Sequence, residues 1–385
     1  LSQNVSWTGG SLFLETSAQR MDLFSEHKYS WQTSPVMIGY RQSLFGYNSL
    51  KWDKRIEPVR YQEAKKSYVE TLELVSASAI NKFFALATAQ SNYDIALFNY
   101  ANADTLYHYA QGRYNIGTIT ENEMLQLELN RLTEETNRMN ARIEMDNCMQ
   151  ELRSYLGIQE DKEIRVRVSS RVPDFSINLN EALALAYENS PDIQTMKRRK
   201  LESESAVARA RANAGLKADI YLRFGLTQTA DKLPEAYRNL LDQQYVSLSI
   251  SLPILDWGRG KGQVRVARSN RDLVYTQVEQ SRTDFELNVR KLVKQFNLQT
   301  QRVRIAARTD ETARRRNEVA RKLYILGKST ILDLNASISE KDSARRNYVS
   351  ALYNYWSLYY TLRSMTLYDF ERNRLLTEDY NLLVE

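Results

Sequence analysis

Hydrophobic and polar residues alternate with period two in four stretches of this chain, a pattern that predicts strands with one apolar and one polar face. In ADIYLRFGLTQT, Leu222 and Phe224 fall on one face, whereas Tyr221 and Arg223 fall on the other. The predicted strands cover residues of about 1–16, 33–44, 218–229 and 244–254.

Long segments without Gly or Pro lie between these strands. Residues 59–111 and 263–326 contain neither, so each can form one helix of roughly 80 to 95 Å at 1.5 Å per residue. Steps of four, three and four, typical of a coiled-coil seam, connect Phe285, Val289, Leu292 and Phe296. The predicted helices cover about 48–116, 119–156, 180–214, 262–326 and 329–378.

An internal repeat relates the two halves of the chain at an offset of 210 residues. The turn RYNIGTIT around Gly117 aligns with LYILGKST around Gly327, and Glu123 aligns with Asp333. We therefore predict a duplication, with a first repeat at 1–158, a linker at 159–178 and a second repeat at 179–385.

One predicted element, the helix at about 180–214, has no counterpart in the first repeat. Asn180 is a candidate N-cap, and Pro191 can open a helix after Asn189 and Ser190. We expect a matching helix upstream of Leu1.

The stretch LPILDWGRGKGQVRVARSN predicts a corner between a strand and a helix. Pro253 suits a strand end because it cannot donate a hydrogen bond. Gly258 is expected to form the corner, and Gly46 the corresponding corner in the first repeat. The spacing of GRGKG does not match a phosphate-binding loop, which needs four residues between its first Gly and Gly-Lys.

Composition narrows the classes of function. The chain has 53 Lys and Arg against 47 Asp and Glu, and its clusters KRRK and RRR have acidic neighbours, which favours solvated helix faces over nucleic-acid binding. Cys148 is the one cysteine, so an internal disulfide framework and a cysteine-based metal site are excluded. His27 and His108 lie in unrelated contexts. We expect no catalytic site, cofactor or metal.

Aromatic residues lie in or beside the predicted strands. Trp7, Trp31, Tyr40 and Tyr245 have the positions expected of an interfacial belt on a membrane barrel. Cross-strand packing in a soluble sheet is the alternative. The helices are far too long to cover four short strands, which favours the membrane interpretation.

These features together resemble the TolC-type outer-membrane efflux proteins of Gram-negative bacteria. The resemblance covers nearly the whole chain. It is carried by LNEALALAYENSPDIQTMKRRKLESESAVARARA, by LPILDWGRGKGQVRVARSN and by the two turns RYNIGTIT and LYILGKST.

The resemblance implies a mainly α fold with a membrane β part. Three protomers would contribute four strands each to one twelve-stranded β-barrel, and long antiparallel hairpins would form an α-barrel tunnel in the periplasm. Closure in a homotrimer would leave no unpaired strand edge in lipid. The expected function is a passive exit channel in the outer membrane, recruited by a periplasmic adaptor and an inner-membrane RND or ABC transporter.

The resemblance also implies roles at the helix turns. Glu123, Tyr324 and Asp333 would form the aperture, with a bond between Tyr324 and Glu123 that helps to close it. Two positions depart from the family pattern, because Ser329 stands where a basic residue is expected and Ala336 where a second acid is expected. The adaptor would dock at the tips: Gly117, Thr118, Ile119, Gly327, Lys328, Ser329 and Thr330.

Other classes of protein also use long helices. A soluble periplasmic coiled-coil scaffold or adaptor is the main alternative, although adaptors join one hairpin to compact β domains that this sequence lacks. A coiled coil that binds nucleic acid would use the basic clusters. A requirement for detergent during purification would separate the channel from both.

Overall fold

The computed structural model describes residues 1–159, 162–169, 172–252 and 254–376. The chain forms two compact units. The first consists of Leu1–Lys65 and Pro191–Asp284, and the second of Lys66–Ser190 and Phe285–Glu385. Two long helices, α1 (Ser49–Asn115) and α5 (Arg259–Ile325), contribute residues to both units.

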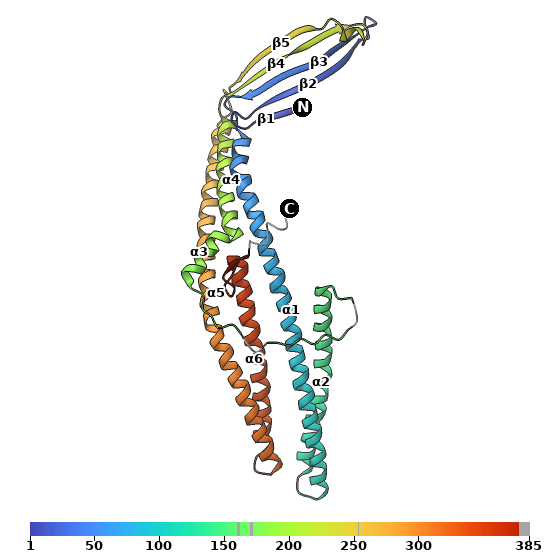
Figure 1. The fold of residues 1–385 in the computed structure, drawn as a ribbon, viewed down its shortest axis with the longest axis vertical. Coiled ribbons are helices and arrows are strands. Elements are labelled where there is room, and N and C mark those ends of the chain that lie inside the picture. Colours follow the sequence, from blue (N-terminus) through green and yellow to red (C-terminus); the bar gives the residue numbers. More distant parts are fainter. Residues whose placement is uncertain (160–161, 170–171, 253, 377–385) are drawn as a thin grey trace. The chain divides into compact units, whose positions relative to one another are not determined.

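The first unit contains an antiparallel sheet whose strands follow chain order from β1 to β5 (Figure 1). A bulge in β3 shifts the register between Thr33 and Val36. Thr33 is fully buried, and its hydroxyl donates to the Ala236 carbonyl of the short 3-10 helix η1 (Glu235–Tyr237). The strands are β1 (Ser2–Val5), β2 (Gly10–Leu23), β3 (Lys28–Ser43), β4 (Lys217–Ala230) and β5 (Leu241–Ser251).

The two faces of this sheet differ, as the alternation predicted. Ile38 pairs with Phe224, and Leu222 pairs with Val246, so aliphatic and aromatic side chains line up across the strands. On the opposite face Arg223 pairs with Tyr245. The exposed apolar side chains on the first face are Leu12, Leu14, Val36, Ile38, Phe224, Val246, Leu248 and Ile250.

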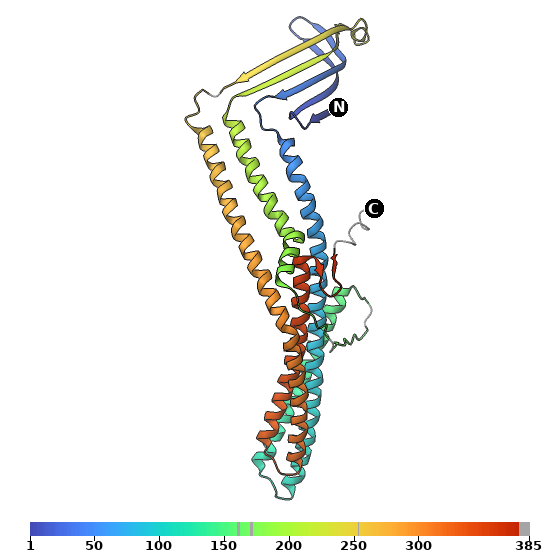
Figure 2. The ribbon, with the colours of Figure 1, turned by 60° about the vertical axis from the view of Figure 1, so that its left-hand side comes forward.

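Three helical segments adjoin the sheet within the first unit. Helix α4 (Pro191–Ala214) lies between α1 and α5 (Figure 2). Arg198 on α4 donates to Glu63 on α1, and Lys200 donates to Glu279 on α5 at 2.8 Å. Charged side chains therefore join α4 to the helix on each side.

The second unit is helical and contains two antiparallel hairpins. Helix α1 pairs with α2 (Glu121–Leu156), and α5 pairs with α6 (Ile331–Thr366) (Figure 1). The predicted seam on α5 is inside the core: Phe285, Val289 and Phe296 are buried and Leu292 is half-buried. Around Phe296 pack the rings of Phe175, Tyr355 and Tyr359.

The segment that follows α2 is irregular over its described residues, 157–159, 162–169 and 172–178. Side-chain amides hold it in place. Gln90 on α1 accepts from the Val166 N–H and donates to the Ile164 carbonyl, and Asn297 on α5 makes the same pair of bonds with Ile177. These amides provide hydrogen-bond partners for backbone N–H and C=O groups that lie outside any helix or sheet.

Helix α3 (Leu179–Asn189) precedes α4, so the predicted helix at about 180–214 is two helices. The break falls at Ser190, whose extended backbone (φ −62°, ψ 136°) suits a residue before proline. The N-cap is Asn178, not Asn180, because the Asn178 side chain accepts from the backbone N–H groups of Asn180 and Glu181.

The helices of the two hairpins have matching bounds. Adding 210 converts the ends of α1 into those of α5, and the ends of α2 into those of α6. Each pair has equal lengths, 67 residues for α1 and α5 and 36 for α2 and α6. The offset found in the sequence therefore holds at every helix end of the two hairpins.

Two predicted boundaries differ from the structure. The predicted strand 1–16 is interrupted by a turn, where Gly9 has φ 77°, so the described chain has five strands in this sheet where four were expected. The predicted helix 329–378 ends at Thr366, because Leu367 is left-handed (φ 48°) and its N–H bonds to the Arg363 carbonyl. Two short strands follow, β6 (Tyr368–Asp369) and β7 (Arg374–Leu375).

Candidate functional site

The turns that join the helices of each hairpin have one geometry. Gly117 has φ 72° and Gly327 has φ 70°. In the first turn the Gly117 N–H bonds to the Tyr114 carbonyl and the Thr118 N–H to the Arg113 carbonyl. The second turn repeats both bonds from Gly327 and Lys328. This pair of bonds is a Schellman motif, in which a left-handed residue ends the helix.

A capping box opens the second helix of each hairpin. The Thr120 hydroxyl accepts from the Glu123 N–H at 3.2 Å, and the Glu123 carboxylate accepts from the Thr120 N–H at 3.0 Å. Thr330 and Asp333 form the same reciprocal pair on α6. Both predicted aperture acids are therefore the third residues of helices, where a carboxylate also benefits from the helix dipole.

Asp333 has more donors than this box alone supplies. Its carboxylate accepts from the Thr330 hydroxyl at 2.7 Å and from the Ser329 hydroxyl at 3.3 Å. The bonds from the Thr330 side chain and backbone lower the pKa of Asp333 below its usual 3.8, with smaller contributions from Ser329 and Arg316. Ser329, which replaces the expected basic residue, thus supports the same carboxylate as a neutral donor.

Both turns line one cavity of about 320 Å³ in the second unit. Tyr324 and Glu123 both border it, together with Arg113. Burial raises the pKa of the Tyr324 hydroxyl, Arg113 opposes that rise and Glu123 adds to it. Within the described residues, Glu123 accepts its hydrogen bonds from Thr120 and none from Tyr324.

The predicted docking positions lie at the turn tips. The Thr118 hydroxyl donates to the Arg113 carbonyl at 2.9 Å, so this side chain helps to end α1. Ile119 and Ser329 are half-buried, and Lys328 is exposed. A Cβ atom added at Gly117 or Gly327 would meet nothing within 4 Å, so the positive φ alone favours glycine there.

The four predicted belt aromatics lie at different places on the sheet. Trp7 is in the turn before β2 and is 89% exposed, and the Tyr40 hydroxyl contacts Thr8 of that turn. Trp31 is at the other end of β3, where the Arg20 guanidinium lies 5.9 Å from its ring. Tyr245 lies on the polar face of the sheet, because strand alternation points its side chain away from the apolar face.

The polar face is rich in arginine and aromatic rings. The Arg223 guanidinium lies 5.7 Å from the Tyr245 ring, and Arg41 lies 5.5 Å from the Tyr221 ring. Phe13 stacks on Tyr221. Cation–π contacts of this kind hold arginines in fixed positions on a surface.

The corner between β5 and α5 contains an acidic residue, Asp256, that the sequence motifs did not identify. Asp256 accepts from the N–H groups of Gly258 and Gly260 at 2.9 and 2.7 Å, which lowers the pKa of its carboxyl. Gly258 has φ 80°. At Gly46 a Cβ would lie 2.4 Å from the Ser43 hydroxyl. Pro253 lies outside the described residues.

The basic clusters are engaged with acids and amides of the helices. Arg198 pairs with Glu63 and Glu202, and Arg199 donates to Gln277. The Arg198 side chain is 24% exposed, so KRRK is an interhelical contact and more than a solvated face. The RRR arginines pair with acids on α5 and α6: Arg314 with Asp310, Arg315 with Glu311 and Arg316 with Glu340.

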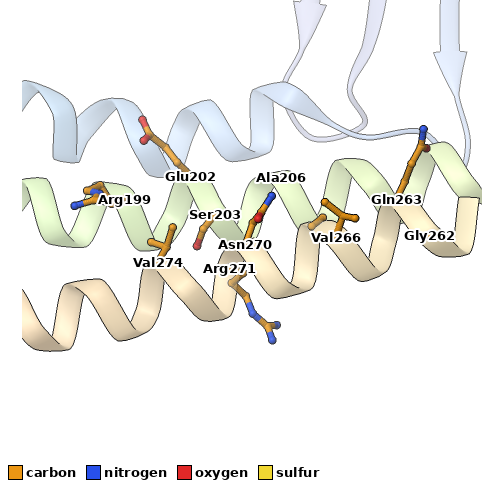
Figure 3. Close-up of a pocket in the computed structure, with 11 residues that line it drawn as sticks. Arg199, Glu202, Ser203, Ala206, Gly262, Gln263, Val266, Asn270, Arg271 and Val274 are labelled. Carbon is orange, nitrogen blue, oxygen red and sulfur yellow. The ribbon is translucent and has the colours of Figure 1, made fainter.

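A groove of about 670 Å³ lies between α4 and α5 in the first unit. Figure 3 shows the small and apolar side chains that face it, among them Ser203, Ala206, Val266 and Val274. Glu202 at its edge accepts from Arg198 and Arg60. The Glu202 carboxylate is thus engaged by one arginine of α4 and one of α1.

Two searches of the described residues gave negative results. No described helix has a stretch both long and apolar enough to span a membrane. The described residues also contain no cluster of three His, Cys, Asp or Glu side chains suited to a metal ion.

Comparison with solved structures finds the same fold in outer-membrane channels. The Campylobacter jejuni CmeC outer membrane channel matches with a TM-score of 0.73 and 14% identity, covering 94% of this chain and 78% of CmeC. Vibrio cholerae VceC matches at 0.70 and 15%, covering 93% of this chain and 86% of VceC. The open-state Neisseria gonorrhoeae MtrE channel matches at 0.70 and 14%, covering 92% and 80%.

Comparison of the sequence alone gives a second result. No curated protein gives a significant match to this chain. The sequence model of the outer membrane efflux protein family matches residues 182–366. This segment includes α4, β4, β5, α5 and α6, and with it the second turn and its capping box. Over residues 182–366 the chain is therefore similar to the outer membrane efflux protein family.

Proposed function

We propose that this protein is the outer-membrane exit channel of a tripartite efflux pump or a type I secretion system. Three copies contribute four long strands each, β2 to β5, to a twelve-stranded barrel. The hairpins form a tunnel of α-helices on the periplasmic side. The channel is a passive conduit, and an inner-membrane RND or ABC transporter supplies the energy through a periplasmic adaptor.

The observation that carries this proposal is the asymmetry of the sheet. Val246, Leu248 and Ile250 on the apolar face are 68%, 60% and 66% exposed. A soluble protein rarely leaves such a contiguous apolar surface uncovered. The opposite face carries Arg41 and Arg223, which suit a water-filled lumen. In a membrane barrel the apolar face would contact lipid on the outside, and the polar face would contact water in the lumen.

The sheet edges support closure with other copies. In the described chain β1 covers β2 only as far as Leu14, so residues 15–23 of β2 form an edge. The outer edge of β5 (Leu241–Ser251) is the other. Open edges carry unsatisfied backbone groups that lipid cannot hydrate. Pairing β5 of one copy with β2 of the next removes both edges.

The aromatic residues agree with a membrane span. Trp31 and Tyr40 are nine positions apart on β3, or about 30 Å at 3.4 Å per residue. A strand tilt of roughly 40° reduces this distance to about 23 Å, near the ~25 Å height of the apolar band on bacterial barrels. We propose Trp31 and Tyr40 for the two interfaces. Tyr245 belongs to the polar face.

The equal helix lengths support the proposed duplication of one hairpin unit. The two turns, their left-handed glycines and their capping boxes recur at the same offset. Strand β5 and helix α5 then correspond to β3 and α1. A soluble periplasmic scaffold or adaptor is less consistent with the exposed apolar face of the sheet.

The assembly can be tested directly. Mass measurement of the purified protein in detergent is expected to give three copies per particle, and the particle should conduct ions in a planar bilayer. A single copy that remains soluble without detergent would contradict the channel. Drug sensitivity of a deletion strain, restored by the wild-type gene, would test the efflux role.

We further propose that the turn cavity contains the aperture. Asp333 is exposed near the tip, and a trimer repeats it three times around the axis, so the site attracts cations. Asp333→Ala should weaken block of the channel by divalent cations added from the periplasmic side. Asp333→Asn is the matched control for shape. Unchanged block in both variants would contradict this role.

A further inference from the structure

Five side chains on the polar face of the sheet form one cluster. Arg223 of β4 pairs with Tyr245 of β5. One level further along the sheet, Arg41 of β3 pairs with Tyr221 of β4, and Phe13 of β2 stacks on the Tyr221 ring. Alternate positions of a strand share a face, so all five side chains point away from the apolar face. We call these five residues the arginine–aromatic cluster.

The three rings of the cluster form a continuous surface. The centroids of Phe13 and Tyr221 are 5.7 Å apart in a stacked arrangement, and those of Tyr221 and Tyr245 are 5.9 Å apart, edge to face. The sheet leaves space for this packing at Gly39, where a Cβ atom would lie 2.1 Å from the Phe13 ring. The rings are therefore held in fixed positions by their neighbours.

The two arginines of the cluster have no carboxylate partner within the described residues. Arg41 lies over the Tyr221 ring, and Arg223 donates one long hydrogen bond, of 3.4 Å, to the Gln243 side chain. The Arg223 Nε is buried without a hydrogen-bond partner in the described chain. The acids on this face, Glu15 and Asp219, belong to the levels on either side of the cluster. Both guanidinium groups therefore keep an uncompensated positive charge.

Another arginine of the sheet shows the usual arrangement. Arg20 of β2 also lies over an aromatic ring, 5.0 Å from the centroid of Tyr29, but it pairs with Asp22 at 2.8 Å. Arg41 and Arg223 instead are diagonal neighbours on adjacent strands, a spacing of about 7 to 8 Å in antiparallel sheets. Like charges at this spacing repel each other. An anion placed between them would remove the repulsion.

The chemistry of the cluster defines the ligand that fits it. A guanidinium group offers a planar fork of N–H donors that suits an anionic group with two or more oxygens. The adjoining rings offer a flat apolar surface, on which an aromatic ring can stack. Both parts are accessible, because Arg41 is exposed and the Tyr245 side chain is 47% exposed.

We infer that the arginine–aromatic cluster binds organic anions that carry a flat ring, the class of aromatic carboxylates and sulfonates, as they pass through the barrel. The anionic group lies between Arg41 and Arg223, and the ring stacks on Tyr221 or Tyr245. This site rests on the proposed channel, because only a channel brings exported solutes to this face of the sheet. It adds a substrate class to that function.

Block of single channels in planar bilayers tests the site with two probes of equal charge. Naphthalene-1-sulfonate has the anionic group and the ring, whereas methanesulfonate has the anionic group alone. The wild type should be half-blocked by naphthalene-1-sulfonate at about a tenth of the methanesulfonate concentration. A variant with Arg41→Gln and Arg223→Gln should need about tenfold or more naphthalene-1-sulfonate for the same block. Its reversal potential in a KCl gradient should also shift toward that of K⁺.

Two further variants separate the parts of the site. Tyr221→Leu with Tyr245→Leu should remove the advantage of naphthalene-1-sulfonate over methanesulfonate, because the stacking surface is lost and both charges remain. Arg20→Gln is the matched control: it removes an arginine that contacts a ring on the opposite face of the same sheet, and it should leave block and reversal potential unchanged. Circular dichroism and the conductance without probe confirm that each variant folds and assembles.

The outcomes distinguish this site from the proposed channel. A wild type that never conducts would contradict the channel, and equilibrium dialysis of naphthalene-1-sulfonate against wild type and arginine variant in detergent then decides whether the site exists. If the wild type conducts and the arginine variant is blocked equally well, the site is wrong although the channel stands. Equal block of the wild type by both sulfonates would overturn the ligand class, and an equal loss of block in Arg20→Gln would reduce the effect to stability of the sheet.

Discussion

The hairpins α1–α2 and α5–α6 have the same backbone but different side-chain chemistry. Their helices match in length, and their turns share a left-handed glycine and a capping box. A buried ion network joins Arg363 of the second hairpin to Glu73 of the first, and its acids are not repeated around Arg153, the equivalent of Arg363. Backbone geometry is therefore set by a few turn and cap residues, which leaves the helix faces free to diverge toward different contacts.

The largest difference between the hairpins is this buried network. Arg363 on α6 donates to Glu73 on α1 at 2.9 Å and lies 3.3 Å from Asp369. All three side chains are at most 15% exposed. At the positions related to these by the 210-residue offset, Arg153 on α2 remains, but Thr283 on α5 and Gln159 replace the two acids.

Arg363→Ala should therefore have the largest effect, a loss of about 3 to 5 kcal/mol, because it leaves two buried carboxylates without their cation. Arg153→Ala is the matched control and should change stability by about 1 kcal/mol or less. Denaturant unfolding in detergent measures both. Equal losses in the two variants would show that the network adds nothing specific to the second hairpin.

This network illustrates what the sequence could not predict. Glu73 and Arg363 are 290 positions apart, and helical periodicity describes faces without saying which faces meet. The long helices, the amphipathic strands and the turn glycines could be predicted because local spacing determines them. The predicted helix bounds ran through the break at Ser190, although Pro191 marked a helix start there, and past the end of α6 at Thr366.

The candidate site was predictable to the same extent. The offset identified Glu123 and Asp333 as equivalent, and the structure gives them the same capping contacts. The offset did not reveal that both carboxylates accept hydrogen bonds within their capping boxes. It also did not reveal that Asp256 accepts from the N–H groups of Gly258 and Gly260 at the start of α5. Short polar side chains near helix starts have several possible partners, so their bonds depend on the folded backbone.

The turn glycines should give the next largest effect. A charged, bulky residue at Gly117 or Gly327 must adopt a positive φ at a cost of roughly 1 to 2 kcal/mol, and it alters the proposed docking tip. Gly117→Glu and Gly327→Glu should each abolish efflux while the assembled particles persist. Gly327→Asn is the control, because Asn tolerates the left-handed region. Normal efflux in both Glu variants would exclude the tips from docking.

Loss of a capping box should cost less. Thr330→Ala and Thr120→Ala should each destabilise the protein by about 1 kcal/mol. The pKa of Asp333 is depressed, so its contribution is present above pH 3.8 and is lost as the pH falls below that value. Thr330→Ala should raise the pKa of Asp333 toward 3.8, which NMR titration of labelled aspartate can measure. An unchanged pKa would mean that Thr330 is not its main donor.

The smallest effect is expected at Tyr324, and it tests whether the turn cavity acts as a gate. Burial raises the pKa of this hydroxyl, so it remains a protonated donor at neutral pH. Glu123 borders the same cavity, and its bonds to Thr120 leave further acceptor capacity on the carboxylate. A bond from Tyr324 would stabilise a closed arrangement by about 1 kcal/mol, which is roughly a fivefold change in the closed-to-open ratio.

Tyr324→Phe removes this donor and keeps the ring, so it should raise single-channel conductance in planar bilayers by favouring the open state. The chain supplies its own control, because Tyr114 occupies the equivalent position in the first turn and is 39% exposed. Tyr114→Phe should leave conductance unchanged if the gate depends on Tyr324 and Glu123. Equal increases in both variants would point to a general loosening of the turns, whereas no increase in either would leave Glu123 with its capping role alone.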